Sequence, residues 1–115
     1  MREPLRDKSR LEHILEAIDT ILNRCEGMTY NSLTADKVLF GGIVYHTMII
    51  GEAAYMLTKE FKDLHPSTPW RQIEGMRHHI VHGYFQVRKD MLWNVIAEDL
   101  EPLKKQIMAY LEEMV

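Results

Sequence analysis

The chain has 115 residues, enough for one hydrophobic core and too few for two, so we expect a single domain over residues 1–115. Hydrophobic residues make up 46% and charged residues 27%, a composition typical of a soluble globular protein rather than a disordered one. The net charge of −3 gives no general reason to expect a nucleic-acid partner, and no run of about 18 apolar residues predicts a membrane span.

The compartment is predicted from the first residues and from the cysteine count. The start, MREPLRDKSR, is charged from its second residue and lacks the apolar region of a secretory signal. Cys25 is the only cysteine, which excludes an intrachain disulfide and a thiolate metal cluster and suits a reducing compartment. We therefore expect a cytoplasmic protein with no membrane partner.

Apolar residues recur at helical spacing, and no alternating strand pattern is present. The predicted helices cover residues 8–25, about 34–62, about 69–83, and a last segment that begins near residue 90. Asp7 and Asp90 are the expected N-caps of the first and last helices, and Pro102 predicts a kink or break near Asp99. The expected fold is an all-α, mostly antiparallel bundle of four to five helices.

The second predicted helix has two unusual properties. Its apolar residues cover more than one helical stripe, which predicts burial on several sides. It also contains Gly41, Gly42 and Gly51, each of which costs roughly 1 kcal/mol of helix stability relative to alanine. Glycines at that density indicate either a kink or a close approach by a neighbouring helix.

A basic segment surrounds the stretch MRHHIVHGYF, residues 76–85. Residues 71–89 carry a net charge of +3, because Glu74 is opposed by Arg71, Arg77, Arg88 and Lys89. The remaining residues carry ten basic and sixteen acidic side chains, or −6. A basic segment of this size could bind a few phosphates but could not cover duplex DNA. We therefore do not expect DNA as a partner.

The residues alone leave three interpretations of this stretch open. His78 and His82 stand four residues apart, the spacing of two metal ligands on one helix, although no further ligand is specified by spacing. A solvent-exposed polar face is the simplest alternative. Against it, Arg77 and Tyr84 fall within the apolar stripe, where an arginine needs a partner such as Glu52 or a phosphate.

The phosphate interpretation gives Arg77 and His82 chemical tasks. The guanidinium matches phosphate oxygens, and a histidine near the expected helix end can hold or release a proton. Together they could cleave RNA without metal, because the 2′-hydroxyl is the internal nucleophile. On an ideal helix, however, the two residues lie about 140° apart and roughly 7.5 Å along the axis. A second copy of the chain, or unwinding at Gly83, would help them converge.

A family resemblance strengthens this interpretation. Arg77, His82 and Tyr84 match the R-x4-H-x-Y motif, and the chain resembles the HepT-like toxins of the HEPN superfamily. The segments similar to that family are IIGEAA (49–54), PSTPWRQIEGMRHHIVHGYFQV (66–87) and MLWNVIAEDLEPL (91–103). His78 stands where relatives often have Asn or Asp, and His46 where many have an arginine.

The resemblance implies an all-α homodimer whose two motifs meet in a cleft at the interface. It implies a ribonuclease toxin that cleaves an RNA substrate with no metal and no cofactor. Its antitoxin would be a minimal nucleotidyltransferase that adds AMP to the motif tyrosine. On this basis Arg77 and His82 would be catalytic, Glu52 and His78 would position the substrate, and Tyr84 would be modified. The alternative is a catalytically weak helical dimer that scaffolds or regulates a nucleotidyltransferase.

Overall fold

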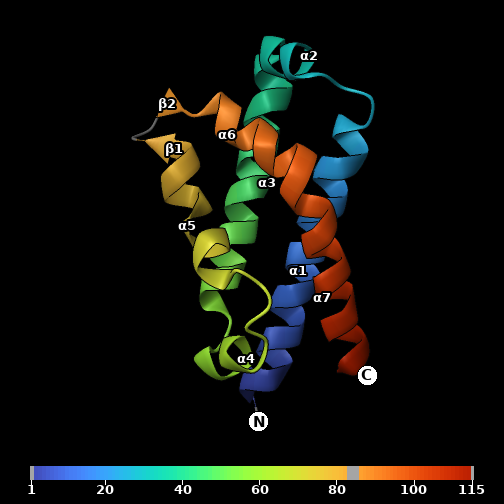
Figure 1. The fold of residues 1–115 in the computed structure, drawn as a ribbon, viewed down its shortest axis with the longest axis vertical. Helices are drawn as coiled ribbons and strands as arrows, with labels where there is room; N and C mark the ends of the chain where they lie inside the picture. Colours follow the sequence, from blue (N-terminus) through green and yellow to red (C-terminus); the bar gives the residue numbers. More distant parts are fainter. Residues whose placement is uncertain (1, 83–85, 115) are drawn as a thin grey trace.

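The computed structural model describes the backbone of residues 2–82 and 86–114 and the side chains of residues 6–81 and 86–114. Its long helices are α1 (Arg2–Cys25), α3 (Lys37–Met56), α5 (Trp70–Ile80) and a final helical segment made of α6 (Lys89–Asn94), a π-helical turn η1 (Val95–Asp99) and α7 (Leu100–Glu113) (Figure 1). The shorter elements are α2 (Tyr30–Ala35), α4 (Lys59–Leu64), β1 (Val81–His82) and β2 (Gln86–Val87).

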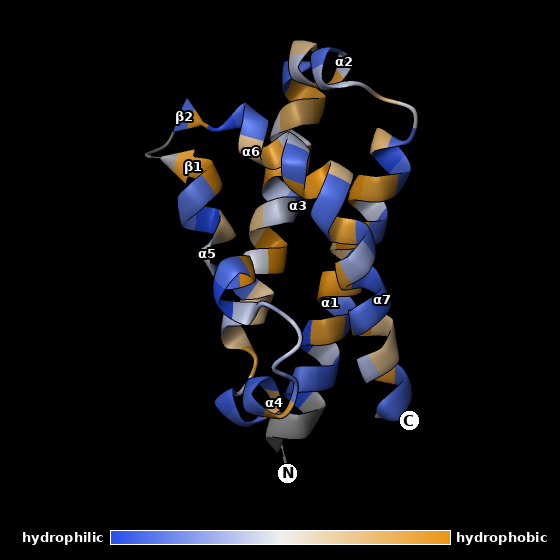
Figure 2. Cartoon of the chain, in the orientation of Figure 1, coloured by the Kyte–Doolittle hydropathy of each residue, from blue (hydrophilic) through white to orange (hydrophobic). Residues whose placement is uncertain are grey.

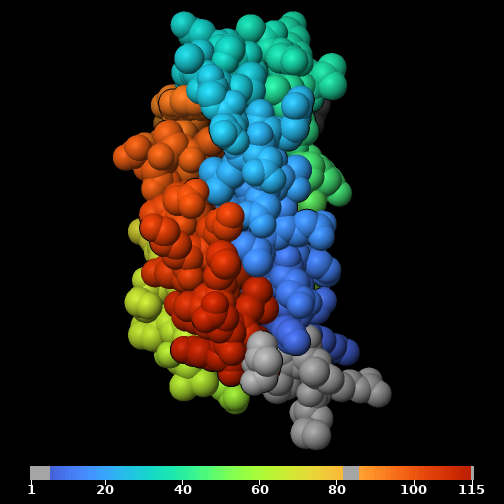
Figure 3. All heavy atoms as spheres, turned by 90° about the vertical axis from the view of Figure 1, so that its right-hand side faces the viewer, coloured from blue at the N-terminus to red at the C-terminus, as the bar shows by residue number. Residues whose placement is uncertain are grey.

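The predicted all-α class is confirmed, although the two short helices raise the number above the expected four to five. α1 packs against α3 and α7, and α3 also packs against α5. Figure 3 shows α1 and α7 side by side along one face of the molecule, with α2 at its end. The fully buried apolar side chains come from every long helix, and among them are Leu11, Ile18, Ile50, Ile80, Leu100 and Ile107.

The helices owe their packing to amphipathic sequences. Apolar bands alternate with hydrophilic ones along them in Figure 2. Ile14 and Ile18 of α1, which lie one turn apart, are both 0% exposed. Burying a side chain of this size contributes about 1.5–3 kcal/mol.

The prediction of one helix over residues 34–62 is wrong, because the chain breaks on both sides of α3. The Asp36 carboxylate accepts the Leu39 N–H at 3.0 Å and caps α3. The Thr58 hydroxyl accepts the Phe61 N–H at 3.1 Å and caps α4. Aspartate and threonine are strong N-cap residues, and here they override an apolar pattern that continues through them.

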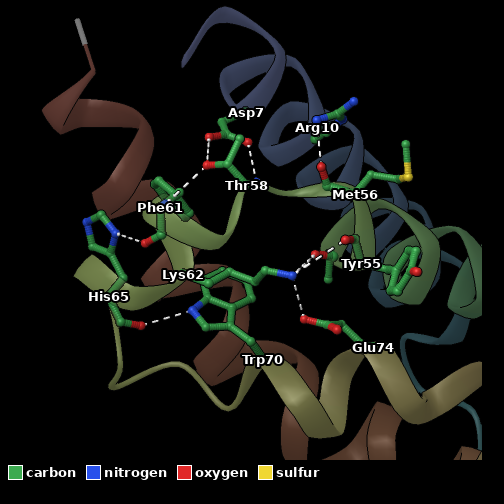
Figure 4. Close-up of polar contacts among 11 residues, drawn as sticks. Asp7, Arg10, Tyr55, Met56, Thr58, Phe61, Lys62, His65, Trp70 and Glu74 are labelled. Carbon is green, nitrogen blue, oxygen red and sulfur yellow. Dashed lines mark hydrogen bonds and ion pairs between the residues drawn. The ribbon is translucent and has the colours of Figure 1, made fainter. Parts of the chain in front are cut away.

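Asp7 is not the N-cap of the first helix, because α1 already begins at Arg2. Its side chain is 3% exposed and accepts two hydrogen bonds from Thr58, from the N–H at 2.9 Å and from the hydroxyl at 2.6 Å (Figure 4). Arg10 donates to the Met56 carbonyl at 2.6 Å beside this contact. These bonds join α1 to the corner between α3 and α4.

The predicted disturbance near Asp99 is present as the π-helical turn η1. The Leu100 N–H donates to the Val95 carbonyl, five residues earlier instead of four. Pro102 has no N–H for the carbonyl four residues before it, and its ring crowds that carbonyl, so the regular ladder fails there. Asp90 lies within the first turn of α6 and is not its N-cap, because the helix begins at Lys89.

The third helix ends earlier than expected, at Ile80 instead of Gly83. Val81 is extended, with φ −111° and ψ 121°, and pairs with Val87 across the antiparallel β1–β2 ladder. The Arg88 N–H donates to the Ile80 carbonyl at 2.7 Å, which closes this hairpin against the helix end. The side chains of Val81 and Val87 both pack on the core. The extended backbone therefore buries these apolar side chains, whereas a helix that continued past Ile80 would direct them elsewhere.

α3 runs unbroken through all three of its glycines, and one of them marks a close approach between helices. A Cβ atom at Gly51 would lie 3.2 Å from the Ile73 carbonyl oxygen and 3.7 Å from the Arg77 nitrogen, both on α5. At Gly41 and Gly42 a Cβ atom would meet no described atom within 4 Å. Only Gly51 is therefore explained by helix packing within the described part of the chain.

α3 is also less buried than the sequence indicates. By length and composition alone it could cross a membrane, yet it packs between α1 and α5. Of its most apolar 18-residue window, 33% is buried. The expectation of burial on several sides is therefore only partly met, and one side of α3 remains open.

Alanine substitutions should separate the packing role of Gly51 from the helix penalty of Gly42. Gly42→Ala should raise the free energy of unfolding by about 1 kcal/mol, because alanine favours the helix. Gly51→Ala gains the same preference but presses on the α5 backbone, at an overpacking cost of about 1–3 kcal/mol. Urea denaturation should therefore rank Gly42→Ala above the wild type and Gly51→Ala below it. Equal stabilisation by both substitutions would contradict the close approach.

Candidate functional site

The close approach at Gly51 places Arg77 of α5 beside Glu52 of α3. Arg77 Nη1 donates to Glu52 Oε1, one of the two kinds of partner, a carboxylate or a phosphate, that the apolar position of Arg77 required. The Arg77 side chain is 23% exposed and that of Glu52 is 57% exposed. The guanidinium is therefore partly withdrawn from solvent, whereas its carboxylate partner remains accessible.

The Tyr55 ring also contacts the Arg77 guanidinium. Its ring centroid lies 4.6 Å from Arg77 Cζ, a cation–π contact worth about 0.5–1 kcal/mol at an exposed site. Arg77 Nε is buried and has no acceptor among the described residues. Tyr55 was not among the predicted site residues, although it lies three residues after Glu52, a spacing that puts both on neighbouring positions of one helix face.

A second ion pair fixes α5 against the end of α3. Lys62 Nζ lies 2.8 Å from Glu74 Oε2 and also donates to the Ala54 and Tyr55 carbonyls at 3.4 and 3.5 Å (Figure 4). The Lys62 side chain is 18% exposed and the Glu74 side chain 24% exposed, so solvent screens this pair less than a surface one. The Glu74 carboxylate is thus engaged by Lys62.

The start of α5 is anchored by Trp70, as expected of a core aromatic residue. The indole N–H donates to the His65 carbonyl at 2.9 Å, and the ring packs at its edge on Phe61. Tyr110 of α7 contacts the same cluster. The helix that carries Arg77 is therefore held at its first turn by aromatic packing and near its middle by Lys62.

The histidines of the motif are not gathered on one helix face. His78 and His79 are exposed on the last turn of α5, whereas the backbone of His82 lies in β1. The helix-end argument for His82 is therefore wrong and applies instead to Arg77 and its two neighbours. The side chain of His82 and all of Tyr84 lie outside the described residues, so their predicted roles stay predictions.

The four-residue helical spacing assumed for a metal pair does not apply, because α5 ends between His78 and His82. Among the described side chains, no group of three or more histidine, cysteine, aspartate or glutamate residues is placed to hold a metal ion. The metal interpretation therefore gains no support from the described part of the molecule.

A groove of about 1040 Å³ borders the Arg77–Glu52 pair between α3, the hairpin and the start of α6. Its lining includes apolar residues and five charged ones, namely Lys37, Glu52, Arg77, Arg88 and Lys89. A second hollow of about 790 Å³, on the α1 side of α3, shares Glu52 and Tyr45 with it and includes His46. The ion pair thus lies where two depressions of the surface adjoin.

The chain is similar over most of its length to proteins of one known family. A family profile described as "Ribonuclease HepT-like" matches residues 14–110. A protein of Caldanaerobacter subterraneus subsp. tengcongensis, named as a candidate RNase, is 36% identical over 90% of this chain and 92% of its own length. A Thermococcus cleftensis protein named "Probable ribonuclease HepT" is 36% identical over 84% of this chain and 88% of its own. No solved structure matches.

Proposed function

The chain belongs to the family of HepT-like ribonucleases, and from this premise we propose that it is a metal-independent endoribonuclease in which Arg77 and His82 are catalytic. The observation that carries the proposal is the placement of Arg77. Its charge is held by Glu52 and Tyr55 at the border of a groove that also contains three other cations. Glu52 uses one of the five guanidinium N–H donors, which leaves others for phosphate oxygens.

The proposed reaction needs only the substrate's own nucleophile. The 2′-oxygen attacks the adjacent phosphorus, the bond to the 5′-oxygen breaks, and the products are a 2′,3′-cyclic phosphate and a 5′-hydroxyl. His82 moves the proton between the 2′-hydroxyl and the leaving oxygen. Arg77 stabilises the charge that develops on the phosphorane oxygens. Exposed His78, on the same helical turn as Arg77, positions the phosphate, and Glu52 orients Arg77.

The open side of α3 favours a homodimer. Val38 is 88%, Tyr45 63%, Tyr55 53% and Met56 46% exposed, and all four lie on this helix. Val38, Tyr45 and Met56 fall on one helical stripe, at spacings of seven and eleven residues. Apolar side chains exposed along one element mark an interaction surface. A second copy packed on this surface would place two Arg77 side chains at the border of a shared cleft.

The antitoxin and its modification are proposed from the family resemblance. A minimal nucleotidyltransferase would transfer AMP to Tyr84, two residues after His82. The added AMP would place a negative charge and a bulky group where the RNA phosphate binds. Electrostatic repulsion and steric overlap would then both prevent the RNA from binding. The protein would then act as the toxin of a toxin–antitoxin pair in the cytoplasm.

Cleavage of RNA in EDTA tests the proposed catalytic residues. Arg77→Ala and His82→Ala should each lower the cleavage rate about 100-fold or more, because each removes a group that acts in the transition state. His79→Ala is the matched control, because His79 is exposed on the same turn and has no assigned role, so its rate should stay within a few-fold of the wild type. Equal cleavage by wild type and His82→Ala would identify a contaminant and refute the site.

Absence of cleavage by every protein would instead favour the scaffold alternative. That conclusion requires that intact mass first exclude AMP on Tyr84 in the purified wild type. It also requires that each variant retain the oligomeric state of the wild type.

Substitution at Tyr45 tests the proposed interface. Tyr45→Glu would place a charge on the exposed stripe of α3 without disturbing the core, so light scattering should show the mass falling from twice 13.6 kDa toward 13.6 kDa. Met108→Glu, at a 43% exposed position on α7, should leave the dimer intact. A dimer unaffected by Tyr45→Glu, or a monomeric wild type, would place the interface elsewhere or remove it.

A further inference from the structure

Three of the cationic side chains that line the groove beside Arg77 take no part in the proposed cleavage reaction. Lys37 opens α3, and Arg88 and Lys89 lie at the start of α6, about fifty residues later in the sequence. The start of α3 and the junction between β2 and α6 lie toward the same end of the molecule in Figure 1. All three side chains are exposed and line the groove that Arg77 borders.

The net charge of this groove is positive. Four cations line it against one carboxylate, that of Glu52, which already pairs with Arg77. Not all cations of the basic segment at residues 71–89 lie at the groove, because Arg71 does not line it. Lys37, which is distant in the sequence, does line it. Folding therefore concentrates positive charge beside the candidate site beyond what the linear sequence shows.

Local structure gives no reason for cations at these positions. Lys37 and Lys89 are the first residues of their helices, where the helix dipole disfavours positive charge. Within the described residues neither lysine makes an ion pair, and Arg88 reaches only Asp90, at 3.8 Å between two well-exposed side chains. Their positive charges therefore remain available to a ligand.

The apolar lining of the groove indicates which class of ligand it suits. Phe40, Val44, Val81 and Val87 line the groove together with the cations. A groove that combines cations for a backbone with apolar surface for bases suits single-stranded nucleic acid, whereas duplex RNA offers its bases only at their edges.

We infer that Lys37, Arg88 and Lys89 form a phosphate-binding subsite that holds the single-stranded RNA to one side of the cleaved bond. The inference rests on the proposed ribonuclease function and names residues that bind the substrate without taking part in bond cleavage. The phosphates next to the cleavage position would contact the three cations, and the intervening bases would contact the apolar residues that line the groove. Contacts of this kind confer affinity with little sequence preference.

Binding of a non-cleavable RNA tests the subsite independently of catalysis. The probe is a fluorescent, fully 2′-O-methylated single-stranded RNA, which has no free nucleophile. The groove variant is Lys37→Gln/Arg88→Gln/Lys89→Gln, and the control is Arg24→Gln/Arg71→Gln/Lys105→Gln. The control removes the same charge from exposed positions outside this groove.

The groove variant should raise Kd about 10-fold or more at low salt. It should also lower the slope of log Kd against log salt concentration by about 2, because each lost single-strand phosphate contact removes about 0.7. With cleavable RNA the loss should fall on KM rather than on kcat. The control variant should retain the wild-type slope.

The outcomes separate this inference from the proposed function. If the groove and control variants show equal slopes of log Kd against log salt concentration while the wild type cleaves RNA, the subsite is refuted and the proposed ribonuclease function stands. Loss of the dimer in the groove variant also overturns the subsite and assigns these cations to the interface. A changed slope with no cleavage by any protein supports RNA binding but contradicts the ribonuclease. Absence of RNA binding by the wild type contradicts both.

Discussion

The candidate site depends on the contact between the backbones of α3 and α5 at Gly51. Because Gly51 has no side chain, the Ile73 carbonyl oxygen and the Arg77 nitrogen can lie 3.2 and 3.7 Å from the position that a Cβ atom would occupy. Glu52 is the next residue along α3, so the approach that brings the helices together also aligns its carboxylate with the guanidinium. Lys62 then holds the two helices by bonding to the end of α3 and to Glu74.

One side of α3 faces the hydrophobic core and the other faces solvent. One side contributes Ile43, Ile50 and Ala54 to the core, and the other leaves apolar side chains and Lys37 in solvent. An exposed apolar stripe and a cation at a helix N-terminus are each unfavourable for an isolated chain. Such local conflicts are common where function rather than stability selects the residue. Here they occur on the side of α3 that also carries Glu52, and Lys37 and Tyr45 line the groove beside Arg77.

Much of the helical structure could be predicted from apolar periodicity, because the periodic side chains are those that pack in the core. The ends of helices were harder. Asp36 and Thr58 carry the caps that divide the second predicted helix, but they lie within an apolar pattern that continues past them. The end of α5 at Ile80 depends on the pairing of Val81 with Val87, which no local pattern shows.

The candidate site, like the fold, could be predicted only in part from the sequence. Arg77 could be singled out because a charge in an apolar stripe needs a partner, and Glu52 is that partner. The contact of Arg77 with Tyr55 and the convergence of Lys37 with Arg88 arise from the packing of helices distant in sequence. His82 was singled out by its spacing, and its role stays a prediction; the argument that placed it at a helix end is wrong, because α5 ends at Ile80.

The central claim is that the protein cleaves RNA through the substrate's own 2′-hydroxyl. The most direct test is mass spectrometry of the product ends after a defined RNA oligonucleotide is incubated with the purified protein in EDTA. The account predicts a 2′,3′-cyclic phosphate on one product and a 5′-hydroxyl on the other, and no cleavage where the reactive nucleotide is 2′-deoxy. Products with 3′-hydroxyl and 5′-phosphate ends, or cleavage of the 2′-deoxy substrate, would contradict it.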